Sequence, residues 1–173
     1  MPAPPSQEDS PACRIIDVTE ERHPECLAVL RVGFGTVAAE FGLTRANTPS
    51  NPAFWEVAEV ARVVAKPMHL IAVEQAGEIV GCAFVGPART LPQTWELRHL
   101  AVVPGARHRG YGEGLVGEAA RRSRQAGAAQ LRIGIVAENR RLAAWYERLG
   151  FISEGMRSVP GLAFAVERLS LAL

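Results

Sequence analysis

A glycine-rich segment that joins a buried strand to a helix constrains the fold of this chain more than any other feature. It reads PGARHRGYGEGLVG over residues 104–117 and contains five of the chain's 16 glycines. The apolar run over residues 94–103 predicts the strand, and the pattern over residues 110–125 predicts the helix. Amides at a helix N-terminus attract anions, and glycines let a phosphate approach the backbone closely. We therefore expect an anion site at this turn, with added positive charge from Arg107 and Arg109.

Hydrophobic periodicity and turn residues predict an alternation of strands and helices along the rest of the chain. The further strands are expected over residues 14–18, 69–74, 78–86, 130–137, 151–156 and 163–172, and the further helices over 24–41, 52–64 and 139–149. This order is typical of a layered α/β sheet protein. Residues 1–12 contain four prolines and no hydrophobic pattern, so we expect a disordered tail followed by one domain over residues 13–173.

Composition excludes several classes of protein. The chain of 173 residues is 48% hydrophobic and 21% charged, as in an average globular domain, and it has no apolar run of the roughly 18 residues that span a bilayer. Its three cysteines, Cys13, Cys26 and Cys82, are widely spaced and form no CxxC, so they predict neither a disulfide framework nor a zinc site. The first residues do not resemble a signal peptide. We expect a cytoplasmic protein that binds no membrane and no metal.

The charge is distributed unevenly along the chain. Residues 1–97 carry a net charge of −5 and residues 98–148 a net charge of +6, within a total of +1. The basic segment suits an anionic ligand and the acidic one a cationic ligand, although arginine-rich helix surfaces would give the same count. An isoelectric point near 7.8 lies below the value of about 9 expected of a nucleic-acid-binding domain, so we expect no nucleic-acid partner.

Two familiar phosphate-binding patterns fit the glycine-rich segment poorly. A P-loop needs lysine directly after its second conserved glycine, and this chain has Tyr111 there. The dinucleotide fingerprint G-x-G-x-x-G is present over residues 112–117, and Glu138 lies about 20 residues further on. That fingerprint, however, begins directly after a strand, whereas a loop intervenes here. A nicotinamide-dinucleotide-binding protein therefore stays only a remote alternative.

A third pattern, R-x-x-G-x-G over residues 107–112, resembles the acyl-CoA-binding loop of the GNAT superfamily of N-acetyltransferases. Two further matches follow the same family at the expected separations. Glu96 lies eleven residues before the loop, on the strand where many members place a general base. The family's helix motif N-x-x-x-A-x-x-Y-x-x-x-G-F is matched by Asn139, Ala143, Tyr146, Gly150 and Phe151. The resemblance covers residues 69–172.

The resemblance implies an α/β (α+β) fold: a single GNAT-type domain with a central mixed, mostly antiparallel sheet of about six or seven strands flanked by four helices. It implies an acetyl-CoA-dependent N-acetyltransferase that transfers the acetyl group directly to an amine, more often a small molecule than a protein. A GNAT-like module that binds CoA for regulation without turnover is the alternative from another class. Many members of the family are homodimers, which makes a homodimer an expectation here as well.

The chemistry of acetyl transfer assigns expected roles to three residues. The amine must lose a proton before it attacks a thioester, and Glu96 suits a general base acting directly or through water. His99 is the alternative base, although strand alternation places it on the opposite face unless a bulge intervenes. By resemblance, Tyr146 is the general acid that protonates the departing thiolate, and the Leu100 amide is the donor to the oxyanion.

The resemblance also implies which residues bind the donor. Leu100, Ala101 and Val102 are expected to line the pantetheine arm. The main chain of the loop is expected to hold the pyrophosphate, and Tyr146 to lie beside the thioester. The residues of that loop are Arg107, His108, Arg109, Gly110, Tyr111, Gly112 and Glu113. Asn139 is expected either to contact the CoA arm or to cap its helix.

The acceptor is expected to enter between the first two helices and the last strand loops, over residues 33–56 and 154–162. The polar and large side chains there are Phe34, Phe41, Thr44, Arg45, Asn47, Asn51, Phe54, Trp55, Met156 and Arg157. They form neither an acidic cage for a polyamine nor a peptide groove. The acidic N-terminal part of the chain favours a cationic amine, and its identity stays open among small amines, amino-acid derivatives, antibiotics and protein N-termini.

Overall fold

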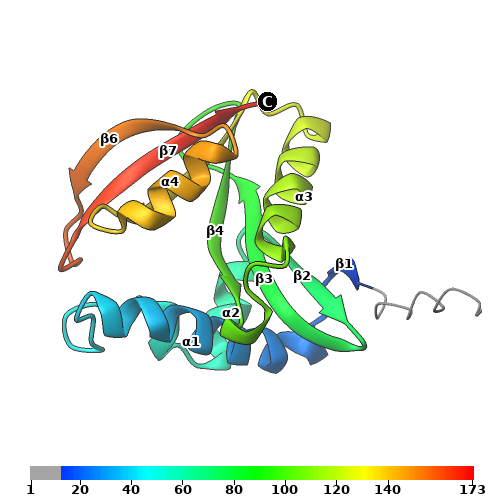
Figure 1. Ribbon diagram of the computed structural model, residues 1–173. Coiled ribbons are helices and arrows are strands. Elements are labelled where there is room, and N and C mark those ends of the chain that lie inside the picture. The colour runs from blue at the N-terminus through cyan, green and yellow to red at the C-terminus, as the bar shows by residue number, and fades with distance from the viewer. Residues whose placement is uncertain (1–12) are drawn as a thin grey trace, which may run out of the picture.

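The computed structural model describes residues 13–173, and the tail predicted over residues 1–12 lies outside the described residues. A seven-stranded sheet runs through the molecule in the order β1-β2-β3-β4-β5-β7-β6 (Figure 1). Its strands are β1 (Cys13–Asp17), β2 (His69–Gln75), β3 (Glu78–Pro87), β4 (Thr94–Val102), β5 (Gln130–Val136), β6 (Ile152–Ser158) and β7 (Ala165–Ala172). The helices are α1 (His23–Glu40), α2 (Val57–Val64), α3 (Tyr111–Gln125) and α4 (Arg140–Arg148). The predicted fold class is confirmed.

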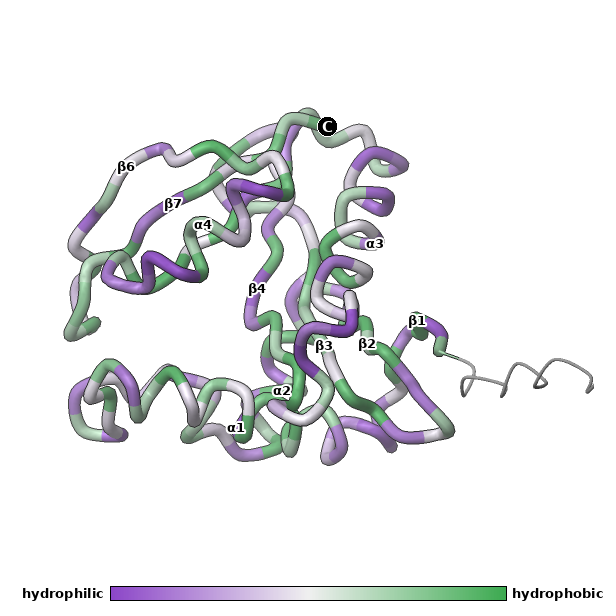
Figure 2. Tube along the Cα trace, viewed as in Figure 1, coloured by the Kyte–Doolittle hydropathy of each residue, from purple (hydrophilic) through white to green (hydrophobic). Residues whose placement is uncertain are grey.

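Helices cover both faces of the sheet, and each face has its own hydrophobic core. On the side called here the α1 face, α1 and α2 pack on residues such as Phe84 and Ala101. On the opposite side, the α3 face, α3 and α4 pack on residues such as Leu97 and Leu169. The two sets alternate along the strands because successive side chains point to opposite faces. Figure 2 shows hydrophilic residues on the side of α3 that points away from the sheet.

The sheet opens between β4 and β5, its only parallel pair of neighbouring strands within residues 13–173. These strands pair over Thr94–Glu96 and Gln130–Arg132 alone. Beyond that point β4 continues beside β3 and β5 continues beside β7, so the two halves of the sheet diverge (Figure 1). We call the resulting gap the wedge, bounded by residues 97–102 of β4 and 133–136 of β5. The backbone edge of β4 that faces the wedge has no partner strand among the described residues.

Two local features differ from the expectations. The helix predicted over residues 52–64 is instead a 3-10 turn at Pro52–Phe54 followed by α2, because Trp55 is extended. The Trp55 indole is buried and donates a hydrogen bond to the Ser50 carbonyl oxygen, and that contact interrupts the helix. The second feature is a bulge in β4 at His99, which has a φ of +52°. It shifts the β3–β4 register between Cys82 and Phe84.

Candidate active site

The glycine-rich loop ends in a helix N-terminus whose amides are free. Gly110 is the N-cap of α3, has a φ of +80° and provides no side-chain cap. By contrast, the Asn139 side chain caps α4 by accepting a hydrogen bond of 3.1 Å from the Leu142 amide. The first amides of any helix lack intrahelical acceptors, so those of α3 are available to an anion. Two roles were expected for Asn139, and the structure shows that it caps the helix. Its contact with CoA stays a prediction.

The space above this loop suits a close approach by phosphate. A Cβ atom built on Gly105 or Gly110 would meet no other atom within 4 Å. Gly112 differs, because a Cβ there would lie 3.2 Å from the Trp145 ring, so this glycine lets the first turn of α3 pack against α4. The backbone of the loop is thus open at Gly105 and Gly110 and tightly packed against α4 at Gly112. The open part fits the pyrophosphate of CoA.

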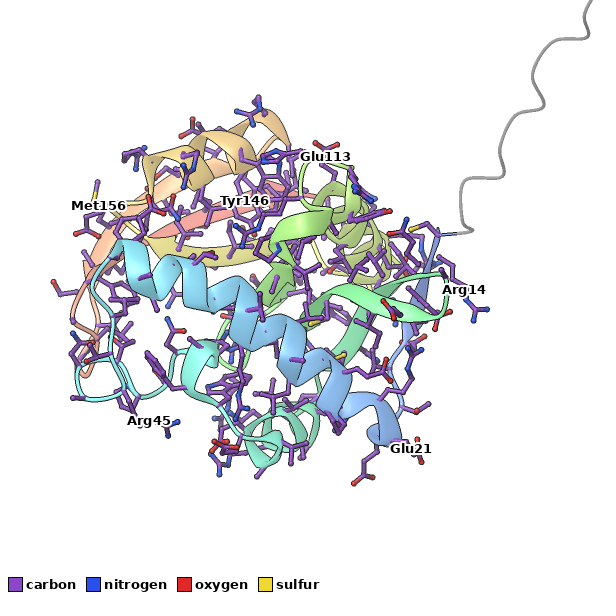
Figure 3. All side chains as sticks on the ribbon, turned by 60° about the horizontal axis from the view of Figure 1, so that its bottom comes forward. Arg14, Glu21, Arg45, Glu113, Tyr146 and Met156 are labelled. Carbon is purple, nitrogen blue, oxygen red and sulfur yellow. The ribbon has the colours of Figure 1, made fainter. Side chains whose placement is uncertain are left out.

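Arg107 turns away from the anion site and ties the loop to α1. Its guanidinium donates hydrogen bonds to the Val102 carbonyl oxygen at 3.2 Å, to the Gly33 carbonyl oxygen at 3.3 Å and to Thr36 Oγ1 at 3.0 Å. His108 and Arg109 are exposed, as is Glu113, which Figure 3 shows at the outer side of the first turn of α3. Of the two arginines expected to add positive charge at this turn, Arg109 is therefore the one whose side chain is exposed.

Leu100, Ala101 and Val102 form the wall of the wedge on β4. Ala101 and Val102 pair with β3 through Cys82 and Gly81, which holds this strand edge in place. Leu100 is partly buried against the α3-face core, while Ala101 belongs to the α1-face core. The three residues predicted to line pantetheine thus lie along the wedge and lead from its narrow end toward the loop before α3.

Tyr146 is buried on the α3 face, beside the wedge. Its ring packs edge-on against Trp145 and Phe151, and only 5% of the residue is exposed. Burial raises the pKa of its hydroxyl well above the ordinary value for tyrosine. The hydroxyl is therefore protonated at neutral pH, and burial disfavours the phenolate form. Figure 3 shows Tyr146 within the body of the molecule, in contrast to the exposed Met156 on β6.

Glu96 is held in an ion pair on the α1 face. Arg98, two residues further along β4, donates to Glu96 Oε2 through Nε at 2.7 Å and also through Nη2. The Glu96 side chain is 15% exposed, and its neighbours across the sheet are Gly86 on β3 and Arg132 on β5. The carboxylate lies at the narrow end of the wedge, where β4 and β5 are still paired.

The bulge brings His99 to the same face as Glu96. Its ring packs edge-on against Trp55 at a centroid distance of 4.7 Å and against Phe34 and Phe84 at about 6 Å. This apolar surrounding lowers the pKa of His99 to about 3, with a smaller contribution from the charge on Arg98. The placement expected from simple alternation is thus wrong, and the bulge is the reason. A neutral imidazole and a carboxylate both line this face near the wedge.

A cavity of about 320 Å³ adjoins the wedge on the α1 face, where the acceptor was expected to enter. It lies among the end of α1, the end of β5 and the segment before β7. Its lining residues are Phe41, Leu43, Asn47, Val136, Glu138, Ala163 and Phe164. Phe41, Leu43 and Asn47 lie within the predicted acceptor region, whereas the lining residues from the end of β5 and from the segments after β5 and before β7 do not. No sequence signal shows that these later segments meet the first helix, because the contact depends on the register of β5 and β7.

Two features of the described residues concern metals and membranes. Over residues 13–173, no group of three or more His, Cys, Asp or Glu side chains is placed to hold a metal ion. No helix in the described part is both long and apolar enough to cross a bilayer.

An uncapped helix N-terminus beside a wedge in a mixed sheet, with a buried tyrosine at its side, is the arrangement that the resemblance to the GNAT acetyltransferases implies. The family comparison agrees: the model of the Acetyltransferase (GNAT) family matches residues 37–151. The chain therefore belongs to the GNAT family of acetyltransferases, as its motifs predicted. None of the curated proteins is a significant match for it.

Solved structures share the fold over nearly the whole chain. The ribosomal-protein-alanine N-acetyltransferase from Brucella melitensis is 23% identical, with a TM-score of 0.72 and coverage of 92% of this chain and 99% of that one. The N-acetyltransferase from Staphylococcus aureus Mu50 is 19% identical, with a TM-score of 0.71 and coverage of 93% and 98%. The PaiA N-acetyltransferase from Thermoplasma acidophilum, solved in complex with coenzyme A, is 15% identical, with a TM-score of 0.71 and coverage of 94% and 99%.

Proposed function

We propose that this protein transfers the acetyl group of acetyl-CoA directly to the nitrogen of a small amine. The observation that carries the proposal is the wedge, which connects two different faces of the molecule. The uncapped start of α3 and Tyr146 lie on the α3 face, whereas the cavity, Glu96 and His99 lie on the α1 face. Donor and acceptor approach from opposite sides, and the thioester meets the amine between β4 and β5.

Each step of the reaction has a candidate group in this arrangement. The amine nitrogen forms a bond to the thioester carbon, and the Leu100 amide donates a hydrogen bond to the resulting oxyanion. The carbon–sulfur bond then breaks, and the thiolate leaves with its electron pair. Tyr146 is the proposed donor of a proton to that sulfur, because its hydroxyl is protonated at neutral pH. The products are the N-acetylated amine and free CoA.

Glu96 is the proposed base, with His99 as the alternative. The ion pair with Arg98 holds the Glu96 carboxylate in place at the narrow end of the wedge. A water molecule between the amine and Glu96 would carry the proton over the remaining distance. His99 is uncharged at neutral pH and faces the same side, so it competes for the role.

Calorimetric titration with acetyl-CoA, and with NAD as the control, tests the donor site. We expect micromolar binding of acetyl-CoA alone, about −8 kcal/mol, followed by release of free thiol when amines are added. Binding without release of thiol for any amine would favour a regulatory CoA-binding module. Binding of NAD in place of acetyl-CoA would refute the assignment of the loop.

Two single substitutions then test the base. Glu96→Gln is expected to shift the pH dependence of turnover, while His99→Gln leaves its shape unchanged. The reverse result would transfer the role to His99. An unchanged profile in both variants would leave neither residue as the base.

A further inference from the structure

The α1 face of the sheet carries an arginine that no other side chain neutralises. Seven arginines of the described chain are partly buried: Arg22, Arg31, Arg98, Arg107, Arg122, Arg132 and Arg168. Five of them pair with carboxylates, and Arg107 bonds the backbone and Thr36 of α1. Among these seven, only Arg168 on β7 has neither an ion pair nor a hydrogen bond through its side chain. A partly buried guanidinium without a partner favours an anion supplied from outside.

Arg168 reaches over β5 toward the wedge. It is the register partner of Gly134, and a Cβ atom at Gly134 would lie 3.3 Å from Arg168 Nη1 and 3.6 Å from its Cζ. The guanidinium thus lies on the backbone of Gly134, two residues past the last β4–β5 pair. Any larger residue at position 134 would displace it. The absence of a side chain at this position makes room for the arginine at the rim of the wedge.

The same row of residues leads from Arg168 to the cavity. Gly134 and Val136 share the α1 face of β5, and Val136 lines the cavity. Val166 is the register partner of Val136, and its Cγ1 atom would lie 3.1 Å from a Cβ built on Gly134, so these residues are neighbours on this face. An acceptor that fills the cavity and presents its nitrogen to the wedge therefore passes Arg168.

Among the described residues on this face of the sheet, Arg168 and the exposed Arg157 of β6 have no carboxylate partner, and Arg168 is the one that is partly buried. Arg98 pairs with Glu96, and Arg132 pairs with Glu154 across the bulge of β6. The Arg132 Nε is buried and has no partner, which adds a free donor to the same face. Five of the seven residues that line the cavity are apolar, and its one charged residue is the acid Glu138. An anionic group is therefore attracted to Arg168 and repelled from the far end of the cavity.

We propose that Arg168 binds a carboxylate of the acceptor, and that the enzyme acetylates a small apolar amino acid on its amine. This inference rests on the proposed function and specifies its substrate class. A volume of about 320 Å³ is at the lower end of the roughly 300–1,000 Å³ of small-molecule sites, which suits a single amino acid. The aromatic and aliphatic lining favours an apolar side chain, and a bidentate contact with Arg168 fixes the carboxylate.

The test compares acceptors that differ only in the carboxylate. Leucine is matched with leucinamide and isopentylamine, and phenylalanine with phenylalaninamide and phenethylamine, in the wild type and in Arg168→Gln. Each substitution effect is the ratio of kcat/KM between variant and wild type for one acceptor, so the basicity of the amine cancels. We expect the ratio to fall by roughly 10–100-fold for the two amino acids, the loss typical of a charge-assisted hydrogen bond. For the amides and simple amines we expect a change of less than about 3-fold.

Two further variants control for indirect effects. Arg168→Lys keeps the charge and is expected to recover part of the activity toward amino acids. Arg124→Gln removes an exposed charge from the last turn of α3 and is expected to change no ratio. An equal loss for every acceptor in Arg168→Gln would overturn the inference, because it would show a structural role. A wild type that prefers the amides would overturn it as well.

A binding measurement separates this inference from the proposed function. If acetyl-CoA binds but no amine is acetylated, the proposed function is wrong. The carboxylate site is then tested separately, by titrating CoA-saturated protein with N-acetylleucine and with N-acetylleucinamide. Preferential binding of N-acetylleucine that disappears in Arg168→Gln supports the carboxylate site on its own. Equal binding of the two compounds refutes it.

Discussion

Replacing Gly33 with alanine tests how closely α1 approaches the wall of the wedge. A Cβ on Gly33 would lie 2.8 Å from the Cβ of Ala101 on β4. Both atoms are attached directly to the backbone, so neither is able to rotate away, and α1 must move. Gly35, two residues further along the same helix, is the matched control because a Cβ there would meet nothing within 4 Å.

The expected magnitudes follow from two opposing effects. Alanine improves helix propensity over glycine by about 1 kcal/mol at either position. At Gly33 the overlap costs about 1–3 kcal/mol, as overpacking of a core usually does. We therefore expect Gly35→Ala to stabilise the protein by about 1 kcal/mol and Gly33→Ala to destabilise it by about 1 kcal/mol. The difference of about 2 kcal/mol isolates the packing cost.

Urea unfolding followed by circular dichroism measures both free energies of unfolding. Adding Ala101→Gly to Gly33→Ala removes the overlapping atom and is expected to recover more than 1 kcal/mol relative to the sum of the single effects. The Gly33 carbonyl also accepts a hydrogen bond from Arg107, so Gly33→Ala is expected to weaken acetyl-CoA binding as well. Equal stabilisation by Gly33→Ala and Gly35→Ala would refute the close contact.

Three further predictions concern the site and the charges near it. Tyr146→Phe is expected to lower turnover roughly 100-fold with little change in the affinity for acetyl-CoA, and equal turnover would remove Tyr146 as the acid. The His99 imidazole, with a pKa of about 3, is expected to show no NMR titration above pH 5 in the folded protein, and a midpoint near 6.5 would contradict its apolar environment. Hydrogen bonds from Arg121 and Arg122 lower the pKa of Glu118 to about 2, below the ordinary 4.5. Glu118 therefore contributes to the free energy of unfolding above pH 4.5, and this contribution is lost as the pH falls toward 2. After allowance for solvent screening it is at most about 2 kcal/mol. If Glu118→Gln lost stability in acid as steeply as the wild type, this assignment would be refuted.

Local patterns of apolar runs, prolines and glycines predicted most of the fold. The order of elements is correct, and α1, α3 and β4 lie within one residue of their predicted bounds. The errors arise where a long-range contact overrides a local pattern. Trp55 interrupts the predicted second helix by packing into the core, and the bulge at His99 reverses the face that alternation assigns to it.

The sequence motifs predicted the parts of the candidate site that the backbone forms. They predicted less well the parts in which side chains from different strands and helices meet. The loop before α3 and the position of Tyr146 follow from sequence spacing. The direction of the Arg107 side chain does not, since it depends on where α1 crosses β4. Arg168 had one weak signal, a charged pair with Glu167 inside an apolar strand. Its position over Gly134 depends on the β5–β7 register, which no local pattern reveals.

The open amides of α3 and the unpaired edge of β4 have a consequence for how this protein tolerates mutation. Every residue except proline carries the same amide, so most substitutions along these segments leave the donor contacts in place. Only positions such as Gly110, with its φ of +80°, demand a particular residue. Sequences that share this architecture are thus free to diverge, as the 23% identity with the Brucella melitensis structure illustrates. In the proposed mechanism, a change of acceptor would alter a few side chains around the cavity and leave the backbone contacts to the donor intact.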